Sequence, residues 1–195
     1  MKSAMKPMMD LWLRLRRSAQ DLFGDISGIA ATEFALVVPV MLILFFGTDE
    51  FSSGIAVNRK VTLMARTLSD LTSQNLSVTD TQLTNIFNAS TGILTPYSAT
   101  PVRSTITELY VDPNTLAARV QWSRGSAPRT AGNTVPIPSA LQIGGTYLIF
   151  SEVSYSFVPT VGYVLKNSIT LSDFTFTRPR QSLCVMYATT VCTTT

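Results

Sequence analysis

The hydrophobic pattern of the 195-residue chain changes its period twice along the sequence. Residues 29–47 are apolar apart from one ionisable side chain, Glu33, and as a helix they would measure roughly 28 to 30 Å, close to the hydrocarbon thickness of a bilayer. Beyond them, apolar residues recur every three or four positions as far as Leu71, which is typical of an amphipathic helix. The pattern predicts a transmembrane helix at residues 29–48 that continues as an exported amphipathic helix at 49–72.

The helical period ends in a polar run, residues 72–81. Thr79 and Asp80 offer an N-cap for a short helix that extends to about Ala89. After Pro96, β-branched and aromatic residues lie between turn signals, which predicts strands at 102–111, 116–123, 147–157 and 169–177. Residues 123–145 are rich in Gly, Pro, Ser and Thr and are expected to form a long surface loop.

The predicted strands indicate how the exported head is built. The first two are close enough to form a hairpin, and one side of it is expected to face inward through Leu116, Ala118, Val120 and Trp122. One side of the third strand carries Tyr147, Ile149, Val153, Tyr155 and Phe157. We therefore expect an α+β fold, in which residues 73–195 form a head whose antiparallel sheet of about four strands packs on the exported half of the long helix.

Composition excludes several classes of function. The net charge of +3 is small and dispersed, so no nucleic-acid partner is expected. The sequence has no histidine, which removes Ser-His-Asp catalysis and His-ligated zinc, and it has no glycine-rich nucleotide motif. The expectation is a protein without enzymatic activity, cofactor or metal.

The charges that flank the apolar run predict the topology. A Lys/Arg excess precedes the run, in the form of Lys2, Lys6, Arg14, Arg16 and Arg17. By the positive-inside rule the N-terminus is cytoplasmic and the rest is exported. A secretory signal peptide is disfavoured by its poor cleavage site, and twin-arginine export by the residues after the arginine pair. A plain signal anchor explains everything except Glu33, which is costly in an apolar helix.

The string from Gly28 to Phe34, Gly-Ile-Ala-Ala-Thr-Glu-Phe, resembles the processing site of type IV pilins, especially the Tad/Flp (tight adherence, type IVc) branch. The continuation through Pro39, where we expect a helix kink, is similar to the start of TadE-like pseudopilins, the TadE/TadF/TadG group. The resemblance implies that residues 1–28 are a leader cut after Gly28, that Ile29 is the new N-terminus, and that Glu33 and Phe34 are its fifth and sixth residues.

The resemblance also implies partners and a location. They are a prepilin peptidase, other Tad pilins or pseudopilins, the inner-membrane assembly platform and membrane lipid. The protein would be a single-pass component of the bacterial inner membrane with a periplasmic head, and it would act in pilus assembly, adhesion and biofilm formation. In such pilins Glu33 is expected to pair with the α-amine of a neighbouring subunit and set axial register.

A second similarity lies near the end of the chain. The string from Glu152 to Pro159, followed by residues 177–180, is similar to the C-terminal strand of TadE/TadG-type proteins. Farther on, Cys184 and Cys192 enclose a short loop, and a structural disulfide is expected there in the periplasm. The alternative function is an unprocessed single-pass membrane protein whose exported head binds an envelope or assembly partner.

Overall fold

The computed structural model describes residues 27–159, 167–190 and 192 of the chain. The chain divides into two compact units, Met1–Gly47 and Thr48–Thr195. A single long helix, α2 (Ser27–Ser73), supplies the whole described part of the first unit and the opening segment of the second. Most of the predicted leader, residues 1–26, lies outside the described residues.

The second helix of the exported region begins where its capping residues predict. Helix α3 (Asp80–Thr91) has Thr79 as its N-cap. The Gln82 amide donates to Thr79 Oγ1 at 3.3 Å, and the Thr79 amide donates to Gln82 Oε1 at 2.9 Å. This reciprocal capping box satisfies two amides at the end of the helix, and it confirms the predicted start. A short 3-10 helix, η1 (Gly92–Leu94), follows.

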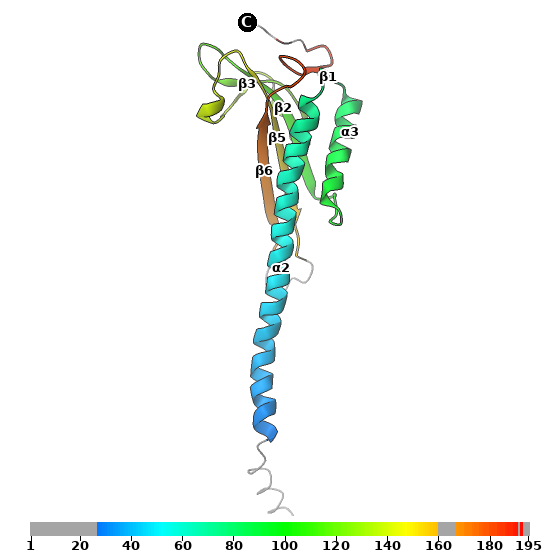
Figure 1. Ribbon diagram of the computed structural model, residues 1–195, viewed down its shortest axis with the longest axis vertical. Helices are drawn as coiled ribbons and strands as arrows, with labels where there is room; N and C mark the ends of the chain where they lie inside the picture. Colours follow the sequence, from blue (N-terminus) through cyan, green and yellow to red (C-terminus); the bar gives the residue numbers. More distant parts are fainter. Residues whose placement is uncertain (1–26, 160–166, 191, 193–195) are drawn as a thin grey trace, which may run out of the picture. The chain divides into compact units, whose positions relative to one another are not determined.

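An antiparallel sheet of five strands forms the other layer of this unit (Figure 1). Its strands are β2 (Val102–Val111), β3 (Ala118–Gly125), β4 (Thr134–Val135), β5 (Tyr147–Phe157) and β6 (Ile169–Thr177), in the order β4-β3-β2-β5-β6. Three of the four predicted strands have the predicted bounds, and the hairpin of β2 and β3 is confirmed. The predicted α+β fold is confirmed as well.

The sheet buries one face against α2. The shared core contains, from the helix, Val57, Val61, Met64, Ala65 and Leu68, and from β5, Ile149, Val153, Tyr155 and Phe157. Polar contacts fix the same packing, because Ser151 Oγ donates to the carbonyl of Ala65 at 2.6 Å. The predicted one-sided pattern of β5 is therefore confirmed for these residues, and the stripe of α2 is core from Val57 to Leu68, whereas Phe51 is exposed.

The opposite face of the sheet carries a second apolar cluster, which the sequence did not predict. Gly125 ends β3 with a φ of 132°, and a Cβ there would lie 2.2 Å from the carbonyl oxygen of Ser104, so the position requires glycine. The following residues, expected to be a surface loop, include β4 and the 3-10 helix η2 (Ser139–Leu141). Val135 is buried against this face, with Ile137 and Leu141 beside it. The loop prediction was therefore wrong for this stretch.

The inward pattern predicted for β3 was wrong in two places. Leu116 lies before the strand, has a φ of 57° and is exposed. It belongs to the tight turn that begins at Asp112, whose carboxylate accepts from the amides of Asn114 and Thr115. A register shift then places Val120 opposite Leu109 but Trp122 opposite Glu108. This bulge directs Val120 to the outer cluster and Trp122 to the core against α2, although period-two alternation would place both on one face.

Candidate functional site on the apolar helix and the C-terminal clasp

The residues of the predicted processing site lie on the first turns of α2. Gly28 is exposed, and a Cβ added there would meet nothing within 4 Å. Packing against the described residues therefore does not require a glycine at this position. Ile29 is 55% and Phe34 is 70% exposed. Glu33 lies beside Phe34 and is exposed too. The segment therefore offers its side chains to surroundings outside the chain.

The apolar character of α2 continues as far as Gly47 without cover from other described residues. Its exposed large apolar side chains are Ile29, Phe34, Leu36, Val37, Val40, Met41, Leu42, Ile43, Leu44 and Phe45. The helix is long and apolar enough to cross a membrane. Helical geometry continues on both sides of Pro39, which supplies no amide to the helix, and a kink there stays a prediction. Such a helix fits a single-pass membrane protein.

A loop closed by Cys184 and Cys192 lies at the other end of the chain. The two residues form a disulfide with a Cα–Cα distance of 5.8 Å. We call the loop from Cys184 to Cys192 the C-terminal clasp. Within it, strand β7 (Met186–Tyr187) pairs in parallel with β1 (Ser77–Val78), so the clasp is joined to the segment between α2 and α3.

Val185 is held by hydrogen bonds on both sides. Its amide donates to Glu108 Oε1 at 2.6 Å, and its carbonyl accepts from Trp122 Nε1 at 2.8 Å. The side chain of Val185 is fully buried in the core shared with α2. Val185 thus anchors the clasp in the interior of the head.

Burial raises the pKa of Glu108 from its ordinary value of 4.5 to about 8, against the opposing effects of the Val185 amide and Trp122. The sequence analysis did not single out Glu108. A signal was present in the sequence, since Glu108 lies two positions after Ile106 and therefore on the same face of β2, the face that packs in the core.

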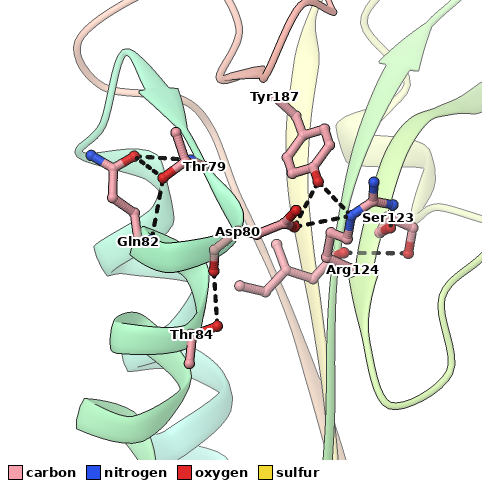
Figure 2. Close-up of polar contacts among 8 residues, drawn as sticks. Thr79, Asp80, Gln82, Thr84, Ser123, Arg124 and Tyr187 are labelled. Atoms are coloured by element: carbon pink, nitrogen blue, oxygen red, sulfur yellow. Dashed lines mark hydrogen bonds and ion pairs between the residues drawn. The ribbon is translucent and has the colours of Figure 1, made fainter.

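Three side chains meet at the surface of the clasp, as Figure 2 shows. Tyr187 donates its hydroxyl to Asp80 Oδ1 at 2.6 Å and accepts from Arg124 Nε at 2.8 Å. The Arg124 guanidinium also lies 4.2 Å from the centre of the Tyr187 ring. Because Asp80 opens α3 and Arg124 is the next-to-last residue of β3, this cluster ties the clasp to both elements.

The outer face of the sheet has a groove of about 460 Å³ beside its β6 edge. Arg129 forms a bidentate pair with Glu152 on one wall, at 2.6 and 3.0 Å, and Arg103 and Phe174 line the same groove.

Among the described residues no group of three His, Cys, Asp or Glu side chains is arranged to hold a metal ion.

Comparison with known proteins places one segment of the chain in a family. No curated protein and no solved structure matches it. A family model described as TadE-like protein matches residues 28–68, a segment that begins at the glycine of the predicted cleavage site and ends in the buried part of α2. The resemblance inferred from the sequence is thereby confirmed for residues 28–68, which are similar to TadE-like proteins.

Proposed function

We propose that this protein is a minor pilin or pseudopilin of a Tad/Flp pilus. The observation that carries the proposal is the coincidence of the TadE-like match, which starts at Gly28, with an exposed apolar helix that contains Glu33. An apolar helix that the described residues leave exposed needs lipid or neighbouring helices around it. A subunit that moves from the membrane into a pilus assembly meets each of these in turn.

In this proposal a prepilin peptidase cuts the chain after Gly28 at the cytoplasmic side of the inner membrane. The basic residues before the apolar helix keep the leader in the cytoplasm and leave the head in the periplasm. The mature chain then begins at Ile29 and joins other Tad pilins or pseudopilins on the inner-membrane assembly platform. Adhesion and biofilm formation follow from the assembled pilus.

Glu33 has a specific role in the proposal. A carboxylate inside an apolar helix is costly unless it reaches the interface or finds a cation. Cleavage after Gly28 creates such a cation, the α-amine of Ile29, on every mature subunit. Pairing between Glu33 of one subunit and the α-amine of the next neutralises two charges and fixes how far the helices are shifted along the axis.

The first experiment determines the N-terminal residue of the protein purified from membranes of its native host, with Gly28→Asp as the test variant. We expect a start at Ile29, and a start at Met1 in the variant. Since a Cβ at position 28 meets nothing within 4 Å, failure of cutting would report on recognition by the peptidase and not on a folding defect. Gly24→Asp is the matched control and keeps normal cutting.

An uncut chain in both the unsubstituted protein and the variant contradicts the processing proposal. The alternative then leads: an unprocessed single-pass membrane protein whose exported head binds an envelope or assembly partner.

A second experiment separates processing from assembly through Glu33→Ala. Cutting is largely kept because the glycine and the apolar helix are intact, whereas pilus assembly, and with it adhesion and biofilm formation, is lost. Asp49→Ala removes an acidic residue just beyond the apolar helix and serves as the control with normal assembly. Normal pili in the Glu33→Ala strain would show that the carboxylate does not set register.

A further inference from the structure

An apolar surface lies at one end of the second unit, where α2 enters it. Phe51 is 68%, Ile55 43%, Val158 68% and Ile169 40% exposed. We call these four residues the proximal apolar surface. They come from the start of the unit's helix, the residue after β5 and the first residue of β6, so three separate segments expose apolar side chains at the same end.

A shallow pocket of about 240 Å³ lies within this surface. Its lining includes Phe51, Ile55 and Ile169, with Phe157 and Leu171 beneath them. Gly54 lies against Phe157, since a Cβ added at Gly54 would be in ordinary contact with Cε1 of Phe157, at 3.7 Å. The end of β5 therefore packs closely against the first two turns of this part of the helix.

The position of the surface in its unit is distinctive. Phe51 and Ile55 follow Thr48, the first residue of the unit, by three and seven positions, which is about 4.5 and 10.5 Å of helix. Thr48 is itself joined directly to the apolar helix that is long enough to cross a membrane. The polar headgroup zone extends some 5 to 8 Å beyond the hydrocarbon on each side. The proximal apolar surface is thus the first part of the head that a bilayer meets.

The size of the surface favours lipid as its occupant over a protein. A stable protein interface uses about 20 to 30 residues a side. Eight of the described residues line this pocket. Insertion at the boundary between headgroups and acyl chains asks for less, since a narrow apolar face buried by about 5 to 10 Å is enough.

We propose that the proximal apolar surface inserts into the membrane that α2 crosses, at the boundary between the headgroups and acyl chains of the outer leaflet. This contact would hold the head against the bilayer before assembly. Lipid acyl chains are the ligand. The proposal rests on the proposed function, because it requires α2 to be anchored in that membrane. It adds a second, reversible membrane contact that a subunit must release when it leaves the bilayer.

The test uses the full chain in lipid nanodiscs that hold one copy each. Single tryptophans are introduced as Ile169→Trp and Phe51→Trp, and their fluorescence is measured with lipids that carry bromine on the upper part of the acyl chain. Bromine quenches tryptophan on contact. Leu183→Trp is the matched control, because Leu183 is a 56% exposed leucine in the segment that follows Arg180, whose amide donates to Ser73 at the far end of α2. The unsubstituted chain, with Trp12 and Trp122, sets the background.

We expect quenching at Ile169→Trp and Phe51→Trp to exceed that at Leu183→Trp by at least about twofold, as for side chains at an interfacial depth. Quenching at Ile169→Trp no greater than at Leu183→Trp overturns the proposal. A third variant, Leu36→Trp in the apolar helix, separates this failure from failure of the proposed anchoring. Strong quenching at Leu36→Trp with none at Ile169→Trp overturns only the contact of the head, whereas no quenching at any position overturns both.

Discussion

The two halves of α2 are parts of one helix, yet they meet different surroundings. Before Gly47 the large apolar side chains are exposed, as at Leu36, which is 75% exposed. After Thr48 a stripe at the same helical spacing is fully buried, as at Leu68. The second half obtains its cover from the chain's own sheet, and the first half finds no such cover among the described residues. The sequence carries the same difference, because residues 29–47 have one ionisable side chain, Glu33, whereas charged residues lie between the apolar positions of the second half.

The largest effect that tests this comparison comes from matched leucine truncations. Leu68→Ala removes a buried side chain from the core and is expected to lower the free energy of unfolding of the head by about 2 to 5 kcal/mol. Leu36→Ala changes it little, because no core atom of the head contacts that position. Chemical denaturation of the full chain in detergent, followed by Trp122 fluorescence, measures both. Equal losses would show that the halves do not differ in this way.

Removal of the disulfide tests whether the clasp belongs energetically to the buried half. The double variant Cys184→Ser and Cys192→Ser frees a short loop, with an expected loss of roughly 2 to 3 kcal/mol by loop entropy. Thermal unfolding of the head measures the loss. Reduction of the unsubstituted protein should reproduce it, and free thiols in protein isolated from the periplasm, detected by mass spectrometry, would contradict a structural role.

A buried carboxyl of the head tests the buried side of this comparison through the pH dependence of stability. With a pKa of about 8, Glu108 keeps a proton in the folded state that the unfolded chain releases above pH 4.5. The free energy of unfolding from this group therefore falls as pH rises from 4.5 to 8. Glu108→Gln keeps an acceptor for the Val185 amide and loses no proton, so its stability relative to the unsubstituted protein should rise by about 2 kcal/mol between pH 6 and pH 8.

Asp112 supplies a control of opposite sign for that experiment. Backbone amides of Thr115 and Asn114 lower the pKa of its carboxyl. Its contribution is therefore present at neutral pH and is lost on acidification through its folded pKa. Asp112→Asn should change the acid limb of the stability profile and leave the range from pH 5 to pH 8 unaltered. A Glu108→Gln profile parallel to that of the unsubstituted protein would argue against a buried, protonated carboxyl.

The smallest expected effect concerns the cap of α3, which lies wholly in the head. Thr79→Ala removes one side of the capping box and should cost about 1 kcal/mol. Thr81→Ala, at an exposed position in the first turn, is the matched control. Denaturation of the head again gives the difference, and a loss in Thr81→Ala as large as that in Thr79→Ala would assign the effect to helix propensity instead of capping.

Much of this fold was predictable because its long elements carry unbroken patterns. β5 alternates apolar and polar residues over most of its length, and the capping residues of α3 are adjacent in sequence. The strands β1, β4 and β7 were missed, since two residues that pair through their backbones leave no period to detect. The face of Val120 was missed because one bulged residue reverses alternation without a mark in composition.

The candidate site was predictable to a different extent in the two regions. The segment that begins at Gly28 is a local string, so its resemblance to TadE-like proteins could be found from sequence, and the family match confirms it. The surroundings of Val185 combine Glu108 from β2 and Trp122 from β3 with a residue of the clasp, over sequence separations of 77 and 63 positions. No local pattern encodes such a meeting.

The late position of Val185 in the sequence has a consequence for the order of events during export. A head that crosses the membrane N-terminal end first delivers the buried stripe of α2 well before β5, and β5 before Val185. Until those residues emerge, the stripe is an exposed apolar surface of the kind that causes nascent chains to aggregate. The time that the head spends unfinished is therefore set by the rate of translocation, and oxidation of the cysteines comes at the end of that interval.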